Sequence, residues 1–249
     1  MRVLATYSIK GGVGKTTTAV NLAYEAGRAG VRVLVWDLDP QGAATFLLRV
    51  RPKLRGGSRK LVSAKGALAD HVRGTHLDAV HVLPADFSLR HLDVHLEGTR
   101  APTRRVATLL EPVRDHYDLA ILDCPPSISR ASESVFGATD TLLVPVVPAT
   151  LASRTLAQLT SFLDDQLDAP SVAPFLSMVD RRRRLHRELV DSLGSEWPEL
   201  LATAVPSAAV IERMGTERAP LGQYAPNTAA ARAYRRLWSE VATGLWVDA

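Results

Sequence analysis

Short runs of apolar and β-branched residues alternate with segments of helical apolar spacing along the whole chain. Nearly continuous apolar runs predict strands buried on both faces of a sheet. The predicted strands cover residues 3–8, 31–37, 80–84, 119–123, 141–147, 173–179 and 201–205. The predicted helices cover residues 16–29, 103–116, 151–167, 185–193 and 229–243. This alternation predicts an α/β fold with three layers, α/β/α, around a mainly parallel, doubly wound sheet.

Residues that could bind a ligand or take part in a reaction follow three of the predicted strands. A glycine-rich turn follows the first strand, Asp37 ends the second and Asp123 ends the fourth. Ligands of such sheets bind beyond the carboxyl ends of the strands. We therefore expect these three features to converge at one edge of the sheet. The segment 52–58, with its Gly-Gly pair, is expected to be a surface loop.

The glycine-rich turn has the sequence Lys10-Gly11-Gly12-Val13-Gly14-Lys15-Thr16-Thr17. A strand, a glycine turn and a helix N-terminus together form an anion cradle, since free backbone N–H groups and the positive helix end meet there. The turn predicts a nucleotide site formed by Gly11, Gly12, Val13, Gly14, Lys15, Thr16 and Thr17. In it Lys15 would reach the β- and γ-phosphates, and the Thr16 hydroxyl would bind Mg²⁺.

The turn departs from the usual phosphate-loop pattern, because Ile9 stands where that pattern has its first glycine. A second lysine, Lys10, precedes Lys15 by five positions, although the chain has only five lysines among 30 basic residues. A loop with a cation at each end resembles the deviant Walker A motif of the ParA/MinD family of ATPases. The resemblance implies ATP as cofactor and a homodimer in which Lys10 of each subunit reaches the partner's nucleotide.

Two acidic segments extend the resemblance. Asp37-Leu38-Asp39-Pro40-Gln41-Gly42 resembles the DxDPQG motif of ParA proteins, whereas MinD relatives usually lack the Pro-Gln pair. By that resemblance Asp39 orients or activates the attacking water, and Asp37 holds Mg²⁺ through its water shell. The apolar run that ends in Asp123-Cys124-Pro125-Pro126 resembles a Walker B strand, with Asp123 reaching a Mg²⁺-bound water. A structural alternative is that Asp37 and Asp39 only organise a turn.

The C-terminal part also resembles ParA proteins, where the segment around Pro206 would lie near the adenine. The apolar spacing from Tyr234 to Trp246 fits packing of a final helix on the sheet better than a membrane-seeking tail, so no membrane is expected. Cys124 excludes an internal disulfide, fits a reducing cytosol and is expected to pack rather than to react. Residues 1–249 are predicted to form one domain, without an N-terminal helix-turn-helix domain.

The net charge of +4 is modest, but the cations are clustered. Residues 40–69 contain no acidic residue and seven basic ones: Arg49, Arg51, Lys53, Arg55, Arg59, Lys60 and Lys65. A second cluster is Arg181 to Arg184 with Arg187. A third, which we expect to contact DNA, is Arg213, Arg218, Arg232, Arg235 and Arg236. A solvated arginine-rich surface is the alternative for any one of them.

These features predict a weak ATPase, stimulated by a partner resembling ParB, whose ATP-bound dimer binds DNA without sequence preference. The protein would be cytoplasmic and nucleoid-associated, and would partition or position a chromosome, a plasmid or a protein cluster. A MinD-like, membrane-cycling positioning ATPase is the alternative. An enzyme sharing the loop is a third class, from which one cysteine excludes the nitrogenase iron protein, whose subunits each supply two cysteine ligands.

Overall fold

A mainly parallel sheet forms the centre of the protein. The computed structural model describes residues 1–63, 67–164, 166 and 169–246. Its strands are β1 (Arg2–Thr6), β2 (Val33–Asp37), β3 (Arg73–Gly74), β4 (Val80–Leu83), β5 (Leu119–Asp123), β6 (Thr141–Val146), β7 (Ser171–Val179) and β8 (Ala204–Pro206). Their order is β3-β4-β2-β5-β1-β6-β7-β8. Only the edge strand β3 is antiparallel to its neighbour, among the strands described.

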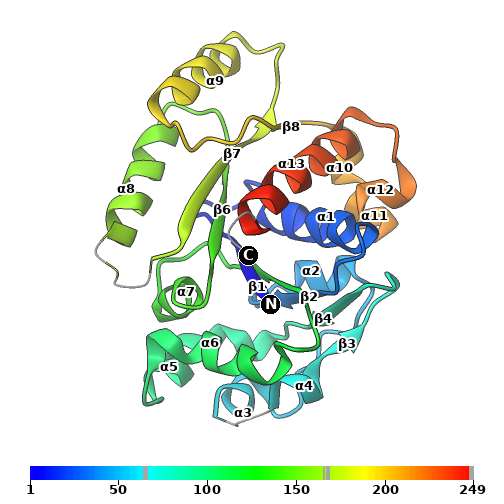
Figure 1. The fold of residues 1–249 in the computed structure, drawn as a ribbon, viewed down its shortest axis with the longest axis vertical. Helices are drawn as coiled ribbons and strands as arrows, with labels where there is room; N and C mark the ends of the chain where they lie inside the picture. The colour runs from blue at the N-terminus through cyan, green and yellow to red at the C-terminus, as the bar shows by residue number, and fades with distance from the viewer. Residues whose placement is uncertain (64–66, 165, 167–168, 247–249) are drawn as a thin grey trace.

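Alternate residues of the central strands enter two separate apolar cores. In β1, Val3 and Ala5 belong to one core and Leu4 to the other. In β2, Trp36 belongs to the first core and Val35 to the second. Successive side chains of a strand point to opposite faces, so a sheet with two buried faces needs helices on both. The three predicted layers are therefore confirmed (Figure 1).

The helices divide between the two faces. One face carries α1 (Lys15–Arg28), α2 (Ala43–Leu47), α10 (Ala209–Glu212), α11 (Met214–Glu217), α12 (Leu221–Tyr224) and α13 (Ala229–Trp246). The other carries α3 (Gly57–Ser63), α4 (Ala67–His71), α5 (Leu92–Glu97), α6 (Arg105–Leu110), α7 (Arg130–Phe136), α8 (Ala152–Asp164) and α9 (Arg184–Glu196). Short 3₁₀ turns, η1 (Phe87–His91), η2 (Pro102–Arg104) and η3 (Glu111–Val113), lie on the latter face.

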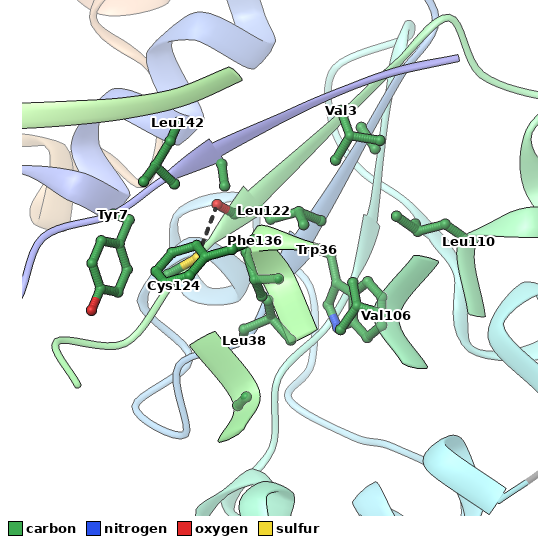
Figure 2. Packing of buried hydrophobic residues seen from close by; sticks show 14 of the residues in the cluster. Val3, Tyr7, Trp36, Leu38, Val106, Leu110, Leu122, Cys124, Phe136 and Leu142 are labelled. Atoms are coloured by element: carbon green, nitrogen blue, oxygen red, sulfur yellow. Dashed lines mark hydrogen bonds between the residues drawn. The ribbon is translucent and has the colours of Figure 1, made fainter. Parts of the chain in front are cut away.

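The core beneath α6 and α7 contains large, fully enclosed side chains (Figure 2). Trp36 is 1% exposed, and the rings of Tyr7 and Phe136 meet edge to face with centroids 4.9 Å apart. Cys124 is buried in this core, where its Sγ donates to the Leu122 carbonyl at 3.7 Å. Burial raises the pKa of the Cys124 thiol, because the thiolate would lose its hydration. Cys124 therefore packs, as predicted.

Several predicted elements need correction. The helix predicted over 103–116 is broken into η2, α6 and η3, because Pro112 has no N–H and its ring clashes with a continuing helix. The predicted loop at 52–58 gives way to α3 from Gly57 onward. The strand predicted over 201–205 is the three-residue β8, Ala204–Pro206. The predicted helix end at Leu167 lies outside the described residues, as does Lys65.

The final helix packs on the sheet. Tyr234, Leu237, Val241 and Leu245 of α13 are buried in the second core. The apolar face of α13 is thus used within the protein, as predicted. Across the described residues, every helix is too short or too polar to cross a membrane.

Candidate nucleotide site

The loop between β1 and α1 has the backbone of an anion cradle. Gly12 and Gly14 have φ angles of 71° and 96°, a region that residues with a side chain rarely adopt. A Cβ at Gly14 would also lie 3.2 Å from the Ser177 hydroxyl oxygen. The Ser177 hydroxyl donates to the Val13 carbonyl at 2.8 Å, which ties the loop to β7. Helix α1 then begins at Lys15, so its free N–H groups face the loop.

The two lysines of the loop have opposite environments. The side chain of Lys15 is 7% exposed, and its Nζ donates to the Lys10 carbonyl at 3.0 Å. Burial lowers the pKa of Lys15, while the nearby carboxyl of Asp123 acts against this shift. The Lys10 residue is exposed. The loop thus directs one ammonium inward and leaves the other available to the outside.

Two carboxylates lie side by side at the ends of adjacent strands, since Asp37 pairs with Asp123 in the β2–β5 register. Asp37 Oδ2 accepts hydrogen bonds from the amide and the hydroxyl of Thr45, both at 2.7 Å. Asp123 Oδ1 accepts one from the Thr6 hydroxyl at 3.3 Å. Asp123 Oδ2 is buried without a hydrogen-bond partner among the described residues.

Both carboxyl groups have raised pKa values. Burial is the main cause at Asp123, and the charge of Asp37 adds to it. Burial also raises the pKa of Asp37, although the hydrogen bonds from Thr45 oppose the shift. Such a pair stays ionised most readily when a cation lies beside it. The partnerless oxygen of Asp123, with the Thr16 hydroxyl close by, fits Mg²⁺, which binds few protein oxygens together with phosphate and water.

A cavity of about 500 Å³ opens above the loop. Of the predicted residues it is lined by Gly11, Gly12, Gly14, Lys15, Thr16, Thr17, Asp39 and Pro206. Val13, Asp37 and Asp123 are buried and are not among the residues that line the cavity. Lys10 instead lines a small apolar cavity between β6 and α8. The volume of the larger cavity, about 500 Å³, is typical of a small-molecule site.

Several residues that line or support the cavity escaped the sequence analysis. Phe46, Met178, Met214 and Tyr234 line it, and Thr45 holds Asp37 in place. Thr45 lies eight residues after its carboxylate, so neither spacing nor residue type marks it as part of the site.

Of the predicted DNA-contacting arginines, Arg213 and Arg218 flank α11 and the other three lie on α13, and several are engaged within the chain. Arg213 pairs with Glu217 at 2.5 Å, and Arg235 lies 3.6 Å from Glu25. Arg218 lies over the Phe46 ring, 4.4 Å from its centroid, and donates to the Phe46 carbonyl. Arg232 and Arg236 are exposed.

Known proteins resemble the chain along nearly its whole length. The profile of a family described as AAA domain matches residues 1–170. The chromosome-partitioning ATPase Soj of Thermus thermophilus is 35% identical over 97% of this chain and 95% of its own. The chromosome partitioning protein ParA of Caulobacter vibrioides is 30% identical over 97% and 94%. The chain belongs to the ParA family.

Solved structures agree with this membership. Cobyrinic acid a,c-diamide synthase from Mycobacterium smegmatis, with a bound ATP analogue and magnesium, superposes with a TM-score of 0.81 at 25% identity, over 98% of this chain and 95% of its own. The cell division ATPase MinD of Pyrococcus furiosus has the same fold, with a TM-score of 0.80 at 22% identity over 97% and 98%. The predicted fold class and family are thus confirmed for this ParA-family chain.

The buried carboxylate pair predicts an unusual pH dependence of stability. The pKa of Asp123 is higher in the folded protein than the value of about 3.9 for an unfolded chain. The native state therefore binds this proton more tightly, and the nucleotide-free protein should lose stability as the pH rises from about 4 to about 8. Asp123→Asn should flatten this dependence and raise the free energy of unfolding at pH 7 by more than about 1 kcal/mol, measured by urea unfolding.

Asp118 provides the matched control. Its hydrogen bonds from Arg32 lower the pKa of Asp118 to about 2, so this carboxylate contributes stability above pH 4. Asp118→Asn should therefore lower stability at pH 7, the opposite direction. If Asp123→Asn also lowered the free energy of unfolding at pH 7, ionisation of the buried Asp37–Asp123 pair would not destabilise the folded protein, contrary to this prediction.

Proposed function

We propose that this protein is an ATP-dependent dimerisation switch that binds DNA and hydrolyses ATP to partition or position a cargo. The observation that carries the proposal is the arrangement of the loop. Lys15 and Thr16 line the cavity beside the partnerless oxygen of Asp123, while Lys10 stays exposed at the same loop. This arrangement supports a role for Lys15 toward the protein's own nucleotide and for Lys10 toward a neighbour's.

The residues of the cavity fit a magnesium-bound nucleoside triphosphate. We assign the phosphates to the N–H groups of residues 11–17 and to the Lys15 ammonium, and the adenine to the wall that contains Pro206. Thr16, Asp37 and Asp123 would hold Mg²⁺, which neutralises charge on the phosphates when bound. A structural relative at 25% identity is described with a bound ATP analogue and magnesium, which supports this choice.

Hydrolysis needs a positioned water more than covalent help. Asp39 is half-buried at the cavity wall, where its Oδ1 accepts the Gln41 amide at 2.9 Å and its own amide donates to Asp37 at 3.2 Å. These two bonds fix the Asp39 carboxylate beside the cavity. We assign to Asp39 the orientation of the attacking water.

Dimerisation would follow from the second lysine. Lys10 of each subunit would reach the triphosphate of its partner, so the dimer would be stable only while the γ-phosphate is present. A nucleotide shifts such an equilibrium only by its preference for one state. The dimer joins two sets of basic clusters and should bind DNA through phosphate contacts, with little sequence preference.

The cycle would end when a cargo-bound, ParB-like partner stimulates a weak intrinsic hydrolysis. We place the protein on the nucleoid while ATP is bound and free of it afterwards. The relatives named for chromosome partitioning support this assignment. The packing of α13 on the sheet favours it over a MinD-like membrane cycle.

Retention on DNA tests the proposal. We expect the protein to be retained by a DNA duplex with ATP at least tenfold more strongly than with ADP or without nucleotide, because only the ATP state pairs two subunits. The measurement is retention of the full chain on immobilised DNA at 0.1 M salt. Equal retention in the three conditions would refute the switch.

A further inference from the structure

A basic cleft of about 400 Å³ lies beside the edge strand β3, apart from the nucleotide cavity. It is lined by Arg49, Val50, Arg51, Lys53, Arg55, Arg73 and Gly74. Five of these seven residues are cations and none is acidic. The cations of residues 49–55 were recognised in the sequence only as part of a basic segment, whereas the structure adds Arg73 and closes them into one cleft.

The backbone of this cleft is anchored from below. The Leu54 side chain is buried, and its amide donates to Asp86 at 2.8 Å. The Arg55 amide donates to His71 Nδ1 at 3.2 Å. Between these anchors and Arg49 the segment has no helix or strand, and Arg51, Lys53 and Arg55 are exposed. Arg51 and Lys53 are two positions apart, and Arg55 begins the turn that leads into α3.

The cations of the cleft lack carboxylate partners. None of the five lies within 4.0 Å of a carboxylate in the described part of the chain. Arg73 donates to the carbonyls of Asp70 and Val72, which orients its guanidinium without neutralising it. Elsewhere in the described part of the chain arginines do pair with carboxylates, among them Arg2, Arg28, Arg32, Arg114, Arg130, Arg182, Arg184, Arg213 and Arg235.

The cleft adjoins the C-terminal basic cluster through a reciprocal contact. Arg49 Nε donates to the Arg218 carbonyl at 2.9 Å, and Arg218 Nε donates to the Phe46 carbonyl at 3.0 Å. The end of α2 is thereby fixed to the end of α11. Figure 1 shows α2, α11 and β3 on the same side of the molecule, so the cleft and the end of α11 lie on one side of the protein.

We propose that this cleft binds the phosphodiester backbone of duplex DNA, with Arg51, Lys53, Arg55 and Arg73 as the phosphate contacts. The inference rests on the proposed DNA-binding function and assigns its main contact surface to the cleft rather than to the C-terminal arginines. A row of unpaired cations fits a row of phosphates. The described residues that line the cleft include no aromatic ring on which a base could stack, which favours a duplex backbone over single strands or a free nucleotide.

The test compares two charge-matched variants of the full chain with ATP. Arg51→Gln with Lys53→Gln removes two contacts from the cleft, and Arg181→Gln with Arg183→Gln removes the same charge from the second basic cluster. We expect the cleft variant to bind DNA at least about tenfold more weakly at 0.1 M salt. The slope of log affinity against log salt should become shallower by about 2, since each lost phosphate contact contributes about 0.9. The control variant should bind within about threefold of wild type.

Two further arms keep the outcomes distinct. Arg51→Lys with Lys53→Arg retains both charges and should bind like wild type, while thermal unfolding checks that every variant folds. Failure of the wild-type protein to bind DNA in the presence of ATP would refute the proposed function itself. Wild-type binding that survives unchanged in the cleft variant, or that falls equally in the control variant, would overturn only the assignment of the cleft.

Discussion

Lys10→Ala should abolish ATP-dependent dimerisation while leaving ATP binding intact. The Lys10 residue is exposed, and its hydrogen bonds are made by its backbone: the carbonyl accepts from Lys15 at 3.0 Å and the amide donates to the Ser8 hydroxyl at 3.3 Å. On the proposed dimer, the substitution would therefore remove an ammonium from the partner's triphosphate and leave the backbone of the protein's own site in place. We expect the dimer to weaken at least about 100-fold, the order found when one preorganised donor to developing or fixed negative charge is lost.

Sedimentation with a non-hydrolysable ATP analogue measures this effect, and titration with a fluorescent ATP analogue checks binding. Lys60→Ala is the matched control, because Lys60 is an exposed lysine on α3, outside the nucleotide cavity. The control should dimerise like wild type. A Lys10→Ala protein that still dimerises with ATP would remove the proposed role of this residue.

Lys15→Ala should eliminate ATP binding itself. The Lys15 ammonium is held in the cavity by the Lys10 carbonyl and faces the carboxyl of Asp123 across a buried site. A buried ammonium interacts with phosphate oxygens much more strongly than an exposed one, because little water screens it. We expect the dissociation constant for ATP to rise at least about 100-fold, with loss of hydrolysis, dimerisation and DNA retention.

Equilibrium titration with a fluorescent ATP analogue provides the measurement. Lys10→Ala serves as the companion variant, since it should keep ATP binding and lose only the dimer. The two lysines of one loop would then separate two functions. Wild-type affinity in Lys15→Ala would show that the cavity is not the nucleotide site.

The sequence predicted the sheet and the loop well, for a physical reason. Strands buried on both faces must be apolar at successive positions, so β1, β2, β5 and β6 are visible as continuous runs. The short helices α2, α10, α11 and α12 were missed, since four or five residues cannot show a helical period. The two-residue strand β3 gave no signal for the same reason.

The site was predictable only where local sequence defines it. The loop, Asp39 and Pro206 were predicted to share one site, and the structure places them around one cavity. The contacts that hold the site together connect residues far apart in the chain, as with Ser177 and Val13 or with Thr45 and Ala85. Folding alone brings such pairs together. The same holds for the hydrogen bond from Arg49 to the Arg218 carbonyl, which joins residues 169 positions apart.

A crystal structure with a non-hydrolysable ATP analogue and magnesium tests most directly whether one triphosphate is shared by two subunits. We predict a face-to-face dimer in which Nζ of the partner's Lys10 lies about 2.7–3.2 Å from a phosphate oxygen. A nucleotide-loaded monomer, or a dimer whose Lys10 side chains both extend into solvent, would contradict the account.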